Sequence, residues 1–156
     1  KKMKIITGDI NSGKSTRFLK YFSDFENRVG LYSKKLYDEG GVIVGYDLVL
    51  LPLGKTLPFI MLREQADENN LDNYCMQGRF AFSKEAFAAA EEYVRSFPDD
   101  TALWIDEIGG LELKGLGYDS LLKLALESER EIVIVVRQDL LGQVRDKYGI
   151  KEHEIL

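Results

Sequence analysis

Residues 8–15 read G-D-I-N-S-G-K-S, which matches the phosphate-binding pattern G-x-x-x-x-G-K-S at every fixed position. The apolar, β-prone run 3–7 comes directly before this stretch, and residues 14–25 carry apolar side chains at helical spacing. A strand, a glycine loop and a helix start in this order are the context in which the pattern binds phosphate. Glycines allow turn conformations in which successive amide groups point inward. The stretch therefore predicts a nucleoside triphosphate site.

The loop residues have expected roles in holding the triphosphate. The side chain of Lys14 can bridge the β- and γ-phosphates, and the hydroxyl of Ser15 is placed to bind Mg²⁺. The helix that begins near Lys14 adds unpaired amide groups and the positive end of its dipole. A glycine turn followed by a surface lysine is the alternative, which a match of the whole pattern in this context disfavours. The expected nucleotide contacts are Gly8, Asp9, Ile10, Asn11, Ser12, Gly13, Lys14, Ser15 and Thr16.

The composition fits one soluble domain that spans residues 1–156. Hydrophobic residues make up 45% and charged residues 30% of the chain, which is ordinary for a globular protein. The net charge of −5, without a basic stripe, argues against a nucleic-acid partner. The apolar runs are shorter than the roughly 20 residues that cross a bilayer, so no membrane partner is expected. A lone cysteine, Cys75, is expected to be a buried thiol and fits a reducing, cytoplasmic location.

Hydrophobic periodicity predicts an α/β fold. The runs 102–105 and 132–136 are almost wholly apolar, as in parallel strands that helices cover on both faces. Residues 41–51 follow a turn and alternate in part, which predicts a β-hairpin and a third strand beyond it. We expect a mainly parallel sheet with helices on both faces and an antiparallel β-hairpin addition. The predicted strands are 3–7, 29–36, 41–51, 57–62, 102–105 and 132–136, and the predicted helices are 14–25, 84–97, 118–129 and 139–147.

The segment 63–82 shows little periodicity. An irregular segment of this length is uncommon in a compact domain unless it has a function. It is therefore either a flap over the active site or a variable surface excursion, and the sequence leaves both interpretations open.

Two adjacent carboxylates, Asp106 and Glu107, end the apolar run 102–105. At the carboxyl end of a central strand, Asp106 can hold Mg²⁺ opposite Ser15, and Glu107 can orient the attacking water. Adjacent carboxylates repel each other, so a bound cation helps to explain their placement. A solvated strand–loop junction is the alternative. Because a hydrolase needs a base directed at water, Glu107 favours hydrolysis over kinase activity.

The run 104–113, W-I-D-E-I-G-G-L-E-L, resembles the D-E-I-G-x-(M/L)-E-L signature of the small nucleoside-triphosphatase family. That family includes thermophilic enzymes that act on many nucleoside triphosphates and the cancer-related nucleoside-triphosphatase. The stretches 45–48 and 78–80 are similar to two further family segments, and the resemblance covers about residues 3–150. It implies a RecA-like P-loop core and Mg²⁺-dependent hydrolysis of nucleoside triphosphates with broad base tolerance. The chain departs from the family at Asn11, Ser12 and Ser15, and has Ile43 where an arginine is usual.

Charge that develops on the γ-phosphate needs a cation. Arg137 follows the predicted strand 132–136 and is the first candidate, with Arg79 and then Arg63 as the others. Arg17 lies in the first helix and is expected to be solvated. Three functions stay open: a nucleoside-triphosphate phosphohydrolase, a small-molecule kinase, and a nucleotide-switched binding module for cofactor assembly.

Overall fold

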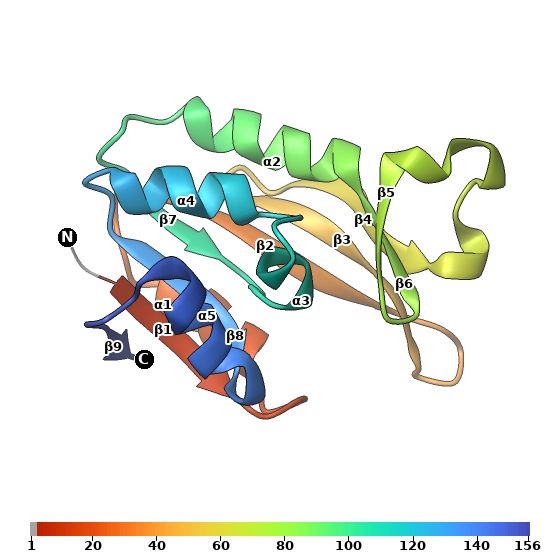
Figure 1. The fold of residues 1–156 in the computed structure, drawn as a ribbon, viewed down its shortest axis with the longest axis horizontal. Helices are drawn as coiled ribbons and strands as arrows, with labels where there is room; N and C mark the ends of the chain where they lie inside the picture. The colour runs from red at the N-terminus through yellow and green to blue at the C-terminus, as the bar shows by residue number, and fades with distance from the viewer. Residues whose placement is uncertain (1–2) are drawn as a thin grey trace.

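The protein forms one mixed sheet flanked by helices, and the computed structural model describes residues 3–156 (Figure 1). Lys1 and Lys2 lie outside the described residues. In the nine-stranded sheet of residues 3–156 the order is β5-β6-β4-β3-β2-β7-β8-β1-β9. The strands are β1 (Met3–Gly8), β2 (Arg28–Tyr37), β3 (Ile43–Leu51), β4 (Lys55–Leu62), β5 (Tyr74–Gln77), β6 (Phe80–Ser83), β7 (Ala102–Ile105), β8 (Ile132–Arg137) and β9 (Glu154–Ile155).

The helices lie on both faces of the sheet, and the predicted α/β class is confirmed (Figure 1). Their bounds are α1 (Lys14–Ser23), α2 (Lys84–Arg95), α3 (Gly110–Leu113), α4 (Asp119–Glu127) and α5 (Leu141–Tyr148), with short 3₁₀ turns at Arg63–Gln65, Glu68–Asn73 and Gln138–Leu140. The hydroxyl of Ser83 caps α2 by accepting from the amide of Ala86 at 3.2 Å. No helix within residues 3–156 is long and apolar enough to cross a membrane.

The sheet has a parallel half and an antiparallel half. Strands β2, β7, β8, β1 and β9 pair in parallel, whereas β3, β4, β6 and β5 extend the sheet from β2 with antiparallel pairs. Because parallel strands end at the same edge, the loop after β1 and the residues after β7 meet there. The cross-strand partners Gly8 and Arg137 mark this edge.

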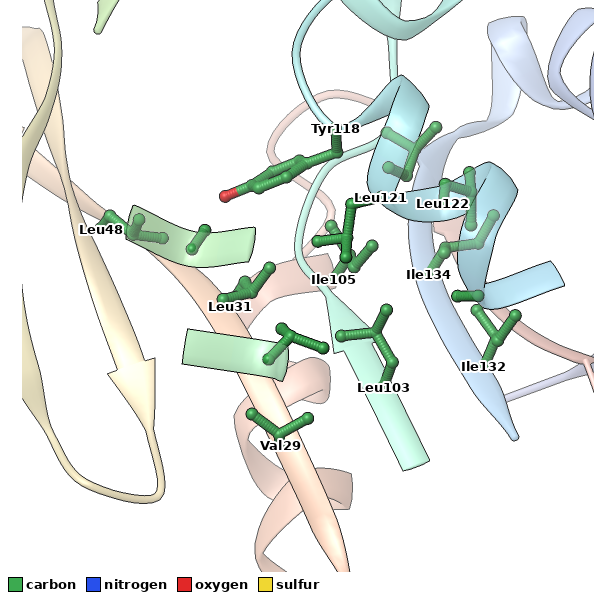
Figure 2. Close-up of a cluster of buried hydrophobic side chains, with 14 of the residues drawn as sticks. Val29, Leu31, Leu48, Leu103, Ile105, Tyr118, Leu121, Leu122, Ile132 and Ile134 are labelled. Carbon is green, nitrogen blue, oxygen red and sulfur yellow. The ribbon is translucent and has the colours of Figure 1, made fainter. Parts of the chain in front are cut away.

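Alternate residues of the parallel strands supply two hydrophobic layers. On the face of α1, the fully buried Trp104 makes edge-to-face contacts with Phe18, Phe22 and Phe25 at ring-centroid distances of 5.8, 5.5 and 5.0 Å. The opposite face packs against α2, α4 and α5. There, aliphatic side chains of the strands lie under the first residues of α4 (Figure 2). These two layers pack on both faces of β7 and so fix the position of the residues that follow this strand.

The segment 63–82 is more regular than the sequence predicts. After two 3₁₀ turns it forms the β5–β6 hairpin, whose strand β6 pairs with β4. The antiparallel part therefore exceeds the predicted hairpin and third strand. Each of these two strands has only four residues, and neither has enough positions to show a clear period in the sequence.

The prediction that Arg17 is solvated is wrong. Its guanidinium donates to the carbonyl of Thr7 and, at 3.2 Å, to that of Leu156. Because α1 packs on β1 and β9 pairs with β1, the carbonyls of Thr7 and Leu156 both lie within reach of Arg17. Arg17 therefore ties the helix of the glycine loop to the sheet.

Candidate active site

The glycine loop has the left-handed turns that its sequence requires. Gly13 begins α1 with φ at 82°, a conformation that glycine adopts without steric cost, and Asn11 has φ at 60°. The amide of Ser12 donates to the carbonyl of Asp9 at 3.1 Å, which closes the turn. The first amides of α1 have no partner within the helix and face the hollow of the loop. This arrangement can bind an anion.

Lys14 lies across the loop. Its side chain is buried, and Nζ donates to the carbonyl of Asp9 at 2.8 Å. A buried ammonium group needs a polar partner, and in this structure the loop itself provides one. The cation is therefore already at the position where the loop amides converge.

Asp106 follows β7 and lies against the start of α1. Its carboxylate, only 1% exposed, accepts from the hydroxyl of Ser15 at 3.2 and 3.3 Å and from the amide of Ser33 at 3.1 Å. Burial raises the pKa of Asp106 to about 7, and the negative charge of Glu107 adds to this. The two hydrogen bonds and the positive charge of Lys35 oppose the shift without cancelling it.

The pair of Asp106 and Ser15 fits Mg²⁺. Both offer oxygen donors, and a cation between them would offset the cost of burying the carboxylate. Within residues 3–156, no group of three acidic, His or Cys side chains could hold a metal ion. Mg²⁺ usually takes one or two protein ligands and completes its shell with substrate phosphates and water.

Glu107 has a strained backbone, with φ at 73°. Left-handed conformations of non-glycine residues cost energy and are concentrated at functional sites. The side chain is exposed to the solvent of a concave site, where the surrounding protein removes part of its hydration. This desolvation raises the pKa of Glu107, and the positive charges of Lys14 and Arg137 partly oppose the effect. The Glu107 carboxylate lines the site, and its raised pKa makes it a stronger base than an ordinary glutamate.

The predicted arginines reach the site to different degrees. Arg137, at the end of β8, lines the cavity and makes two 2.8 Å hydrogen bonds to Asp139. Arg79, at the tip of the β5–β6 hairpin, also lines the cavity and donates to the carbonyl of Ile43 at 3.0 Å. Among the described residues that line this cavity, Arg63 does not appear. Both lining arginines have protein partners that they would share with, or release for, a phosphate.

Comparison with known proteins agrees with this geometry. A family model described as NTPase matches residues 4–155. The chain belongs to the NTPase family. The family that the DEIG run indicated is thus confirmed, and membership supports hydrolysis of nucleoside triphosphates in general terms. A search of curated proteins found no match.

A solved structure shares the fold of this NTPase-family chain. The crystal structure of THEP1 from the hyperthermophile Aquifex aeolicus aligns with a TM-score of 0.65 over 99% of this chain and 88% of that chain. The sequence identity is 16%. The match confirms the predicted RecA-like P-loop α/β architecture.

The family signature includes a residue that shapes the site. Glu112 is 4% exposed and accepts from the amide of Gly109 at 2.8 Å and from that of Tyr118 at 2.9 Å. A Cβ at Gly117 would lie 2.2 Å from Oε2 of Glu112, so only glycine fits at this position beside the carboxylate. Glu112 therefore fixes the loop between β7 and α4. Within the run 104–113, Asp106 and Glu107 line the cavity, and Glu112 holds the loop that follows them.

Several residues that line the site were not predicted from the sequence to do so. They come from β2, β3, β5, α3 and the loop before α4, and they are Ser33, Lys35, Tyr46, Gln77, Glu112 and Tyr118. Ser33 and Lys35 lie two positions apart on β2 and face the same side, which a period of two could have suggested. Their position beside Asp106 depends on the pairing of β2 with β7, which no local signal shows.

Proposed function

We propose that this protein hydrolyses nucleoside 5′-triphosphates, including ATP and GTP, to the diphosphate and phosphate in a Mg²⁺-dependent reaction. The observation that carries the proposal is the meeting of the two carboxylates with the glycine loop. Asp106 contacts Ser15 at the start of α1, and Glu107 points into the same hollow as Lys14. A kinase has no need of a carboxylate directed at water, whereas a hydrolase does.

In this proposal the amides of the loop and the ammonium of Lys14 bind the β- and γ-phosphates. Asp106 and Ser15 would hold Mg²⁺, which neutralises phosphate charge when it is bound. The Glu107 carboxylate accepts a hydrogen bond from a water and so orients it toward the γ-phosphorus. Arg137 or Arg79 would stabilise the charge that grows on the phosphate oxygens.

The proposal extends to substrate range, location and partners. Broad base tolerance follows from the family resemblance. A cytoplasmic location fits the single cysteine, Cys75, whose thiol is free and buried as the sequence predicts. The acidic net charge of −5 fits a protein without a nucleic-acid partner.

The test is phosphate release from ATP, GTP, CTP and UTP in the absence of any acceptor. With Mg²⁺ present we expect release from all four nucleotides, and with EDTA in excess we expect none. Release that needs an added acceptor would instead show a kinase. Nucleotide binding without any release would show a switch module, and either result would overturn the proposal.

A further inference from the structure

The cavity of the site continues past the catalytic carboxylates. Its volume is about 540 Å³, and one end is the glycine loop while the other lies over β3, β4 and β6 under the start of α2. Asp106 and Glu107 stand between these two ends. The far end, which we call the aromatic end, is lined by the rings of Tyr46, Phe59, Phe80, Phe82, Phe87 and Tyr118.

The nucleotide does not need the aromatic end. In the proposed function the γ-phosphate lies next to Asp106 and Glu107, because the metal ligand and the base act on it. The nucleoside must then leave the loop on the side away from these carboxylates. On that side α1 continues with Thr16, which is exposed and does not line the cavity. The space beyond the γ-phosphate is left for another molecule.

The rings of the aromatic end form a contact network with open faces. Phe87 contacts Phe59 and Tyr118 edge-to-face at centroid distances of 5.0 and 4.9 Å. Its ring is also parallel to that of Phe82 at 6.4 Å. Phe82 and Phe87 are only half-buried, so both keep surface that faces the cavity. Such an arrangement suits a flat aromatic ring, which gains from stacked and edge contacts.

Polar groups also line the cavity at and beside the aromatic end. Lys35 on β2 and Tyr46 on β3 are cross-strand partners and both line the cavity. Gln77 also lines it, and its Oε1 accepts from Lys114 at 2.5 Å, which leaves the amide protons for a ligand. The hydroxyl of Tyr118 is buried in the core, so only the ring of Tyr118 faces the cavity. An anionic or hydroxyl group of a ligand would find a cation and donors here.

We propose that the aromatic end binds a second small molecule together with the nucleoside triphosphate. Its chemical class is a small aromatic compound with a carboxylate or hydroxyl group, the ring among Phe82, Phe87 and Phe59 and the polar group toward Lys35. The proposal rests on the orientation of the triphosphate in the proposed function. A molecule bound there would lie on the γ-phosphate side of the nucleotide, where a hydrolase of free nucleotides requires no ligand.

The test uses saturation-transfer NMR with three probes: 4-hydroxybenzoate, benzyl alcohol and, as a non-aromatic control, cyclohexanecarboxylate. We expect the two aromatic probes to bind and to stay bound when Mg²⁺ and a non-hydrolysable ATP analogue are added. Phe87→Leu should weaken both by about three- to tenfold, since it removes aromatic contacts. Phe97→Leu is the matched control, because Phe97 lies beyond the end of the same helix and outside the cavity lining.

Lys35→Gln separates the two halves of the proposed site. It should weaken 4-hydroxybenzoate and leave benzyl alcohol unchanged, because only the first carries a negative charge. Competition between the ATP analogue and the aromatic probes would show that the aromatic end holds the base, and this would overturn the proposal. Failure of both aromatic probes to bind would overturn it as well. Joint binding of probe and analogue without phosphate release would reject the hydrolase function and leave the second site standing.

Discussion

The hydroxyl of Ser15 donates to Oδ2 of Asp106 across 3.2 Å, although the two residues are 91 positions apart in the chain. This contact joins the start of α1 to the end of β7. It brings the two halves of the sequence signal, the glycine loop and the acidic pair, into one site. The amide of Ser33 on β2 holds the other side of the contact by donating to the same oxygen at 3.1 Å.

Asp106→Asn tests the metal site, because it keeps the shape and removes the charge. We expect Mg²⁺-dependent phosphate release to fall by at least about 100-fold, since the metal loses its charged ligand. Thermal stability should stay equal or rise, because burying the carboxylate is costly. Asp100→Asn, an exposed position, is the control. Full activity of Asp106→Asn would show that the carboxylate does not hold the metal.

Lys14→Ala tests the phosphate loop. Without the ammonium group the β- and γ-phosphates lose a charge-assisted contact, and we expect affinity for triphosphates to fall by about 10- to 100-fold. Isothermal titration measures the affinity, and Lys20→Ala on the exposed side of α1 is the control. An affinity within about twofold of the unchanged protein would contradict the phosphate-loop assignment.

Glu107→Gln tests the base. The amide keeps size and hydrogen bonding but has no basicity, so hydrolysis should fall by about 10²- to 10⁴-fold while affinity barely changes. Single-turnover phosphate release and a binding titration separate the two effects. Normal hydrolysis would mean that Glu107 is structural, and the hydrolase function would lose its main support.

Arg137 is paired with the Asp139 side chain, whereas Arg79 donates to the carbonyl of Ile43. Variants of the two arginines test which one contacts the γ-phosphate. Arg137→Ala or Arg79→Ala should lower kcat more than affinity, if the guanidinium acts on charge that grows in the transition state. Asp139→Asn removes the partner of Arg137 and leaves the arginine in place. Changed kcat in Asp139→Asn and unchanged kcat in Arg79→Ala would identify Arg137. Should both arginine variants keep full turnover, Lys35 becomes the next cation to test.

Glu112 makes stability depend on pH. Burial raises the pKa of Glu112 to about 7 against its ordinary value of 4.5. The folded state therefore binds the proton more tightly than the unfolded state. The stability that this proton adds is fully present below pH 4.5 and is lost as pH rises through about 7. We expect the free energy of unfolding, relative to Glu112→Gln, to fall by up to about 3 kcal/mol over this range.

Urea titrations of both proteins at several pH values measure this difference. A difference that stays constant with pH would show that the pKa of Glu112 is the same in the folded and unfolded states, because the hydrogen bonds from the amides of Gly109 and Tyr118 offset the effect of burial. Other groups with a raised pKa, such as Asp106, are present in both proteins. Their contribution to the pH dependence therefore cancels in the difference between the two free energies of unfolding.

The sequence by itself determined the features that depend on neighbours in the chain. The glycine loop, the apolar strands β7 and β8, the cap of α2 and the acidic pair 106–107 are all local patterns. Each follows from a backbone requirement or a burial period within about ten residues. These patterns were enough for the family and the α/β class.

Only the tertiary structure decided which residues complete the site. Lys35 and Tyr46 line the cavity because β2 pairs with both β7 and β3, and the β5–β6 hairpin reaches the cavity because β6 pairs with β4. Arg17, which the sequence predicted to be solvated, links α1 to the carbonyls of Thr7 and Leu156. Strand order and register arise from contacts between distant segments, whose energies depend on how the whole sheet packs. No window of the sequence contains that information, so the cavity and its aromatic end appear only in the folded chain.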